Sequence, residues 1–166
     1  MRVLLAVLGL AVAVLPARAQ DHEGCPMKTP AGARQAQVDH RHQDTTGIVS
    51  EGTEHHFLLA RDGGSIRLEA KDPAQAETRD AVRAHLRDIA RAFTAGDFAM
   101  PMRIHDQVPP GVASMKAYGA SIRYTYAATD KGGTVSIATA DPGAVAAVHE
   151  FLRFQIRDHG TGDPIE

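Results

Sequence analysis

The chain has 166 residues and a formal net charge of −2 with histidine neutral, and it carries nine histidines beside one cysteine and no tryptophan. This length suits one domain with a single core. The slightly acidic balance shows no basic stripe of the kind that nucleic-acid-binding proteins carry, so we expect no nucleic-acid partner. A single cysteine cannot form an internal disulfide.

The first 19 residues have the pattern of a cleavable signal peptide. Met1-Arg2 gives a short positive start, Val3–Leu15 is apolar, and residues 17–19 read Ala-Arg-Ala, a cleavage signal of small residues. Cleavage would leave 147 of the 166 residues and remove two arginines but no acid, which changes the formal charge from −2 to −4. A retained membrane anchor is the alternative, but the apolar run is shorter than the roughly 20 residues of a bilayer span. We therefore expect a periplasmic or secreted protein with no membrane span.

Residues 20–54 are polar and show no sustained hydrophobic period, which predicts a flexible leader without regular structure. No C-x-x-C pair occurs in it or elsewhere in the chain. A mobile segment of this composition could capture copper loosely, or it could be a solvated tail. The side chains available for capture are His22, Cys25, Met27, His40 and His42.

A folded domain is predicted over residues 55–166. His55–Ala60 and Ser65–Ala70 are apolar-rich runs joined by Arg61-Asp62-Gly63-Gly64, a sequence typical of a β-hairpin turn. A helix is expected to follow from Asp72-Pro73 to Gly96. Its apolar residues recur at helical spacing at Val82, Leu86, Ile89 and Phe93.

The second half of this domain begins with residues 97–112, which we predict to be a long loop. A short helix is expected over Val112–Tyr118. Strands are then expected over Ser121–Ala128 and Thr134–Ala140. A last helix should run from Asp141-Pro142 to about Asp158.

The two halves resemble each other. GGSIRLEAKDP from Gly63 and GGTVSIATADP from Gly132 share four of eleven positions, the glycine pair and the Asp-Pro pair, at a constant offset of 69. One hairpin with one helix cannot bury its apolar face alone, so two copies should form one core. The predicted fold is therefore α+β, with two ββα repeats that form a four-stranded antiparallel sheet and two helices packed on one face. Chance recurrence of common turn and cap residues is the alternative.

The 97–112 segment brings thioethers and an imidazole close together in sequence, at Met100, Met102 and His105. Thioether and imidazole ligands together suit copper, above all Cu(I). Methionine more often fills gaps in a core, so the two methionines could instead be packing residues.

Further histidines lie on the predicted helices and at the first strand. His85 and His149 fall on the apolar faces of their helices, where they could be ligands or buried neutral rings bonded to local groups. His55 and His56 are neighbours on a strand, so their side chains should point to opposite faces. One of the two could be a ligand, or both could belong to a solvated strand start.

Signatures of common enzyme classes are missing: the sequence has no G-x-S-x-G, P-loop, dinucleotide fingerprint or H-E-x-x-H. His105-Asp106 could form an acid–base pair for a small hydrolase or isomerase, and Asp158-His159 is a similar pair. Such neighbours are common by chance.

Three segments, HHFLLARDGGSI, IHDQVPPGV and FLRFQIRDHGTGD, resemble those of a family of small, exported bacterial proteins that is uncharacterised. The resemblance covers residues 55–163 and implies no activity, ligand or partner.

The leading hypothesis is a periplasmic binding protein for a transition metal, with copper ahead of zinc or haem iron. The predicted metal ligands are His55, His56, Met102, His105 and His149, with His85 and Met100 in reserve. Two alternatives stay open: a protein-interaction module built on the two-repeat sheet, without metal, and the hydrolase or isomerase that uses His105 and Asp106. Whether the chain is an enzyme is left open, although the missing signatures favour a binding protein.

Overall fold

The computed structural model describes residues 31–166. The predicted signal peptide and residues 20–30 of the predicted leader lie outside the described residues. Within residues 31–166, no helix has both the length and the apolarity needed to cross a membrane. In chain order the elements are α1 (Ala31–Thr46), η1 (Ser50–Gly52), β1 (Thr53–Ala60), β2 (Gly63–Ala70), α2 (Ala76–Thr94), α3 (Ala99–His105), α4 (Val112–Tyr118), η2 (Gly119–Ser121), β3 (Arg123–Ala128), β4 (Gly132–Ala138) and α5 (Pro142–His159).

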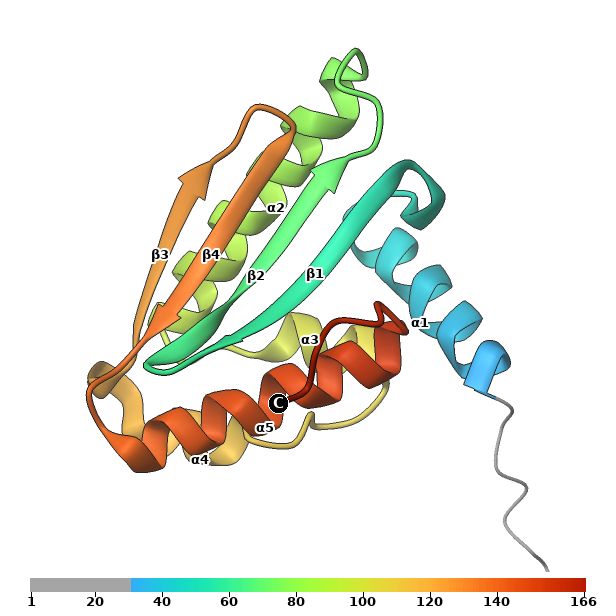
Figure 1. Ribbon diagram of the computed structural model, residues 1–166. Helices are drawn as coiled ribbons and strands as arrows, with labels where there is room; N and C mark the ends of the chain where they lie inside the picture. The colour runs from blue at the N-terminus through green and yellow to red at the C-terminus, as the bar shows by residue number, and fades with distance from the viewer. Residues whose placement is uncertain (1–30) are drawn as a thin grey trace, which may run out of the picture.

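The four strands form one antiparallel sheet in the order β1-β2-β4-β3 (Figure 1). Each hairpin turns at a glycine pair, and Gly63 adopts a φ of 138°, a backbone conformation that side-chain-bearing residues rarely take. The α+β class and the four-stranded antiparallel sheet are thereby confirmed.

One face of the sheet carries the core. Alternation along the strands buries Phe57, Ile66, Leu68, Val135 and Ile137. Both long helices pack on that face. α2 contacts β2, β4 and β3, while α5 contacts β1 and β2 (Figure 1). Each helix therefore lies mainly over the hairpin of the other half of the chain.

The register of the two central strands relates the halves of the domain. Ile66 of β2 pairs with Val135 of β4, the residue 69 positions later in the chain. The offset is the one that relates the two similar sequence segments. An internal two-fold relation would produce such self-pairing, and the repeat itself stays a prediction.

The prediction of a flexible leader without regular structure is wrong for residues 31–52, because α1 and η1 occupy most of this segment. Few apolar residues mark α1, and its attachment depends on buried Val38 and His42, one turn apart on a single face. Ile48, just after the helix, is also buried. A helix with so narrow an apolar face leaves almost no periodic signal in the sequence.

The predicted loop 97–112 also needs correction, because it contains α3. Asp97, two residues before the helix, accepts a hydrogen bond from the backbone N–H of Ala99, the first residue of α3. Pro101 lies in the first turn of α3, where a missing N–H costs nothing. The loop predicted for residues 97–112 includes this proline, although its position suits a helix start.

Replacement of Gly64 by alanine should destabilise the fold. A Cβ atom there would collide with the backbone carbonyl of Leu58 and with Leu152 of α5. Because backbone cannot rotate away as a side chain can, we expect a loss of about 1–3 kcal/mol in the free energy of unfolding. Denaturant titration would measure it.

Gly32→Ala is the control for this substitution. A Cβ atom at Gly32 meets nothing within 4 Å, and the position lies in α1. Its unfolding free energy should stay the same or rise slightly. Equal stability of the two variants would contradict the close packing described for β2 and α5.

Candidate functional site

Five histidines from five different elements meet beside the sheet. They are His42 of α1, His55 of β1, His85 of α2, His105 of α3 and His159 of α5. Ring centroids lie 5.9 Å apart for His42–His55, 5.5 Å for His42–His85, 6.2 Å for His42–His159, 4.9 Å for His55–His159 and 5.0 Å for His105–His159. We call these five residues the histidine cluster. Four of them are at most 8% exposed, and His55 is partly exposed.

Local structure explains how three of the rings reach the cluster. His55 shares its strand face with Phe57, so alternation turns it toward the core. His85 lies on the buried stripe of α2 beside Leu86. His159 is the last residue of α5, and Gly160 in the left-handed conformation then turns the chain away.

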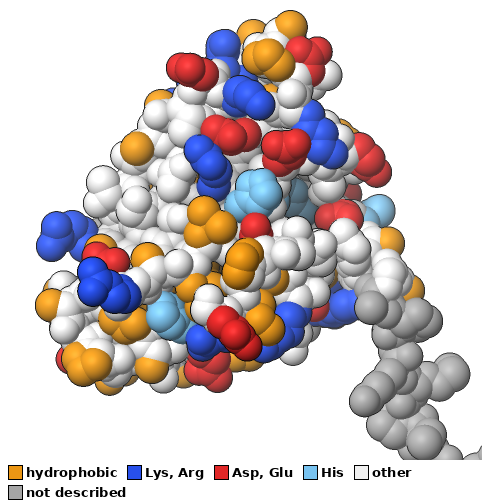
Figure 2. Space-filling model, in the orientation of Figure 1, with side chains coloured by type: hydrophobic (Ala, Val, Ile, Leu, Met, Phe, Trp, Pro, Cys, Tyr) orange, Lys and Arg blue, Asp and Glu red, His pale blue; other side chains and the backbone are white. Residues whose placement is uncertain are grey.

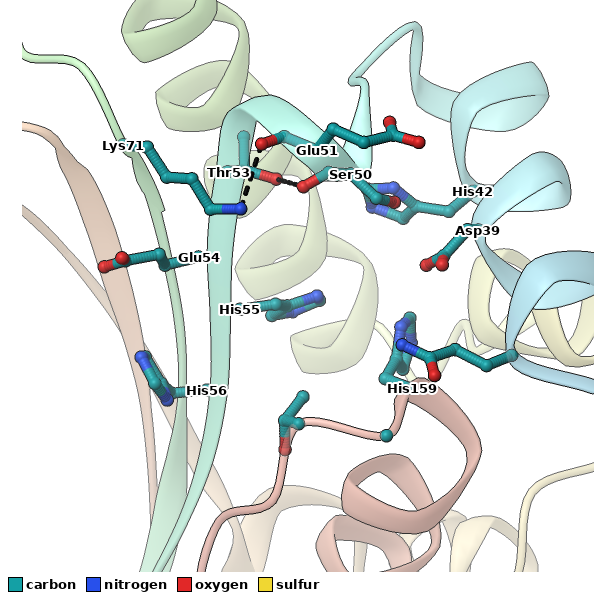
Figure 3. A pocket seen from close by; sticks show the side chains of 13 residues that line it. Asp39, His42, Ser50, Glu51, Thr53, Glu54, His55, His56, Lys71 and His159 are labelled. Carbon is teal, nitrogen blue, oxygen red and sulfur yellow. Dashed lines mark hydrogen bonds between the residues drawn. The ribbon is translucent and has the colours of Figure 1, made fainter. Parts of the chain in front are cut away.

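Two cavities adjoin the histidine cluster. The outer one holds about 520 Å³ and is open to solvent, and His42, His55 and His159 form part of its wall (Figure 3). The inner one holds about 30 Å³, room for a single water or ion, and all five cluster histidines line it. His42, His55 and His159 thus separate the two spaces.

Two ring nitrogens of the cluster lack a hydrogen-bond partner. The Nε2 atoms of His42 and His55 are buried, and neither has a partner among the described residues. Buried polar groups are nearly always satisfied, so such a pair calls for a water, an ion or a ligand between them. The unsatisfied donors or acceptors therefore point to an occupant of the cavity wall.

Burial keeps the cluster neutral. It lowers the pKa of His42 to about 4 and that of His85 to about 4. Burial also lowers the pKa of His55 and His159 well below the ordinary value, and the neighbouring histidines lower it further. At neutral pH these rings therefore carry free lone pairs and no charge.

His105 is held by a polar network of its own. Its Nδ1 donates to Asp158 over 2.6 Å, and its Nε2 contacts the Gln155 amide at 2.8 Å. Arg34 of α1 donates to both carboxylate oxygens of Asp158 at 2.9 Å and to the His105 carbonyl at 2.6 Å. Burial lowers the pKa of His105. Burial acts to raise the pKa of Asp158, but hydrogen bonds from Arg34 and His105 together outweigh it and hold that pKa below its ordinary value. This network fastens α1 to α3 and α5.

The expected convergence of the predicted metal ligands is only partly found. His55 and His105 lie in the histidine cluster, as does His85 from the reserve pair, and Met100 lines the inner cavity. Met102 lies on another side of α3 and lines neither of the two cavities.

His56 and His149 are tied to other partners. In Figure 3 His56 points from the face of β1 opposite to that of His55. The Nδ1 atom of His56 lies 2.8 Å from a carboxylate oxygen of Asp163. His149 contacts the carbonyl of Ala60 at 2.8 Å and lies on the exposed side of α5. His149 therefore does not join His105, because α5 turns it toward the β1–β2 turn. Of His55 and His56, which were expected to face opposite ways, His55 is the one that lies in the cluster.

The sequence did not identify His42 and His159 as part of one site. His42 was assigned to a flexible leader, and its one signal was its spacing of four from Val38. His159 was noted only as a neighbour of Asp158. Asp106, proposed as the acid–base partner of His105, is exposed at the end of α3, and Asp158 takes that place.

Comparisons of this chain with protein-family models, with curated proteins and with solved structures found no match. The site is therefore interpreted from its own geometry.

Stability should fall as the pH drops below about 6.5. Unfolded histidines bind protons near that pH, whereas His42 and His85 in the fold do not until about pH 4. The free energy of unfolding should therefore decrease between pH 6.5 and 4, by up to about 1.4 kcal/mol per pH unit for each of these rings. Denaturant titrations at pH 7.5 and 5 would measure it.

His85→Phe should reduce this pH dependence, because it removes one of the buried neutral rings. A wild-type stability that is flat between pH 7.5 and 5 would contradict the neutral, buried cluster.

Arg34→Gln should loosen α1. The substitution removes the bidentate hydrogen bonds of Arg34 to the Asp158 carboxylate and the hydrogen bond to the His105 carbonyl. We expect a loss of roughly 1–3 kcal/mol in unfolding free energy and faster proteolysis within α1. Arg91→Gln is the control, because its pair with Asp88 is exposed and such pairs contribute little. Equal proteolysis of both variants would show that α1 is held by other contacts.

Proposed function

We propose that this protein binds a transition metal ion, copper first, through His42, His55 and His159 of the histidine cluster. The observation that carries the proposal is the pair of buried, unpartnered Nε2 atoms of His42 and His55. His159 stands beside them on the same cavity wall. Of these three ligands only His55 was predicted from the sequence, and the class of function is the same.

The spacing of the three rings supports shared coordination. A histidine nitrogen about 2.0–2.1 Å from a metal puts the ring centroid about 3 Å from it, so two imidazoles on one ion have centroids about 4.5–6 Å apart. The observed separations of 5.9 Å for His42–His55 and 4.9 Å for His55–His159 fall in this range, and the 6.2 Å of His42–His159 lies just beyond it. Among residues 31–166, no group of three or more His, Cys, Asp or Glu side chains already surrounds one point at ligand distance. Binding therefore includes rotation of the rings toward a common centre.

The electrostatic state of the cluster also supports the proposal. Metal binding to histidine requires the neutral ring, and a proton on it competes with the ion. The lowered pKa values of His42, His55 and His159 remove this competition at neutral pH. The open outer cavity provides a path by which an ion reaches the rings.

Copper is the first candidate because imidazole ligands bind Cu²⁺ most tightly among the first-row divalent ions. Met100 lines the inner cavity behind the rings and adds a soft group on that side. The predicted signal peptide supports a periplasmic or secreted site of action, where the ion would be bound after export.

Neither alternative function gains a comparable argument. The hydrolase or isomerase needs His105 to act with Asp106, but His105 is 1% exposed and both of its ring nitrogens contact Asp158 and Gln155, while Asp106 is exposed. An interaction module stays a prediction, because the outward sheet face is mainly small and polar and indicates no particular partner.

Metal titration of the chain from Gln20 onward tests the proposal. Cys25→Ser should be used as the background, so that the thiol before α1 does not contribute. We expect Cu²⁺ binding tighter than that of a histidine-rich peptide. His55→Phe should weaken it at least about tenfold, because Phe keeps the packing against Phe57 but has no ligand nitrogen.

His149→Gln is the matched control and should bind as the background protein does. A second readout is thermal: saturation at 100 times Kd should add about 2.7 kcal/mol to the unfolding free energy. Binding no tighter than that of the peptide, or an unchanged affinity in His55→Phe, would refute the proposal.

A further inference from the structure

One carboxylate lies beside the three proposed ligand rings. Asp39 precedes His42 by three residues on α1, so the two side chains share a helix face. It lines the outer cavity together with His42, His55 and His159. In Figure 3 its carboxylate lies between His42 and His159 and points into the cavity.

Asp39 is half-buried and lacks a cationic partner in the part of the chain that the structure describes. Burial raises its pKa, hydrogen bonding with Ser50 acts against this, and the charge of Glu51 raises it further. A carboxylate that is partly desolvated and unpaired gains most from a nearby cation.

The other two acids of the cavity are placed differently. Glu54 lies on the outward face of β1 with His56 and points away from the rings (Figure 3). Glu51 presents its backbone carbonyl to Lys71, and its side chain points toward the rim. On the face shown in Figure 2, acidic side chains border a recess in which histidine is visible. Among the three acids, only Asp39 is aimed at the place where the rings meet.

The carboxylate changes which ion the site prefers. Its attraction for an ion grows with the ion's charge, so it favours a divalent over a monovalent ion. Carboxylate oxygen is also a hard ligand, whereas Cu(I) prefers soft sulfur ligands. Three neutral imidazoles alone carry no charge and so would not favour a divalent ion over a monovalent one in this way.

We infer that Asp39 supplies a fourth ligand beside His42, His55 and His159, so that the site takes a divalent ion, Cu²⁺ or Zn²⁺, in preference to Cu(I). This inference rests on the proposed metal-binding function. It adds an oxygen ligand and an oxidation-state preference, neither of which follows from the histidines. α1 then contributes two of the four ligands.

Comparison of Asp39→Asn with the background protein tests the inference, with Cu²⁺, Zn²⁺ and Cu(I) each titrated in competition with a chelator. Asn keeps the size of the side chain and removes the charge. We expect Asp39→Asn to weaken Cu²⁺ and Zn²⁺ at least about tenfold and to leave the affinity for Cu(I) unchanged. Asp44→Asn is the matched control on the same helix, because Asp44 is exposed and pairs with His40, and it should change none of the three affinities.

The outcomes separate the two proposals. Unchanged affinities in Asp39→Asn, or an equal loss for Cu(I), would overturn the fourth ligand while the three-histidine site stands. Absence of binding in the background protein would overturn both. Unfolding curves of Asp39→Asn and Asp44→Asn without metal should coincide, which excludes a loss of α1 as the cause.

Discussion

Burial of several neutral imidazoles in one place is the constraint on which the rest of this structure depends. His42, His85 and His159 are each at most 8% exposed, and each lies near another ring of the cluster. A proton on any of them would place a charge among groups that cannot solvate it. The fold therefore needs every ring neutral, and neutral rings with free nitrogens are what a transition metal requires.

The three-histidine site is complete only because α1 docks on the domain. α1 supplies His42 and covers the space above His55, yet it has few apolar residues with which to hold its position. Polar bonds compensate: Arg34 reaches Asp158 and the His105 carbonyl, and Arg41 donates to the Ile104 carbonyl at 2.6 Å. Stability of the helix and integrity of the site thus depend on the same contacts.

Elements with a strong local signal could be predicted from the sequence. Alternation and glycine pairs located the four strands to within about two residues of Thr53–Ala60 and its equivalents. Asp141 caps α5 as expected, since its side chain accepts from Gly143 and Ala144. These features depend on residues close together in the chain, which a sequence displays directly.

The site could be predicted only in part, because its residues come from five elements. Strand alternation predicted that one of His55 and His56 would face the core, and helical periodicity placed His85 on the buried face of its helix. Neither pattern could show that His149 would bond to the Ala60 carbonyl, since that contact depends on the angle at which α5 crosses β1. Hydrophobic periodicity also could not predict the helix α1, because that helix is held largely by polar residues such as Arg34, which leave no hydrophobic pattern in the sequence.

Asp163 has a consequence for self-association. Its carboxylate accepts the backbone N–H of Phe57 and contacts His56, so the C-terminal tail lies along the outer edge of β1. The Phe57 N–H is already hydrogen-bonded, and the Asp163 carboxylate adds a negative charge beside it. Both features disfavour the pairing of a strand from another chain with that edge. Growth of the sheet by strand pairing, as in fibril formation, is thereby directed to β3, whose outer edge no described strand covers.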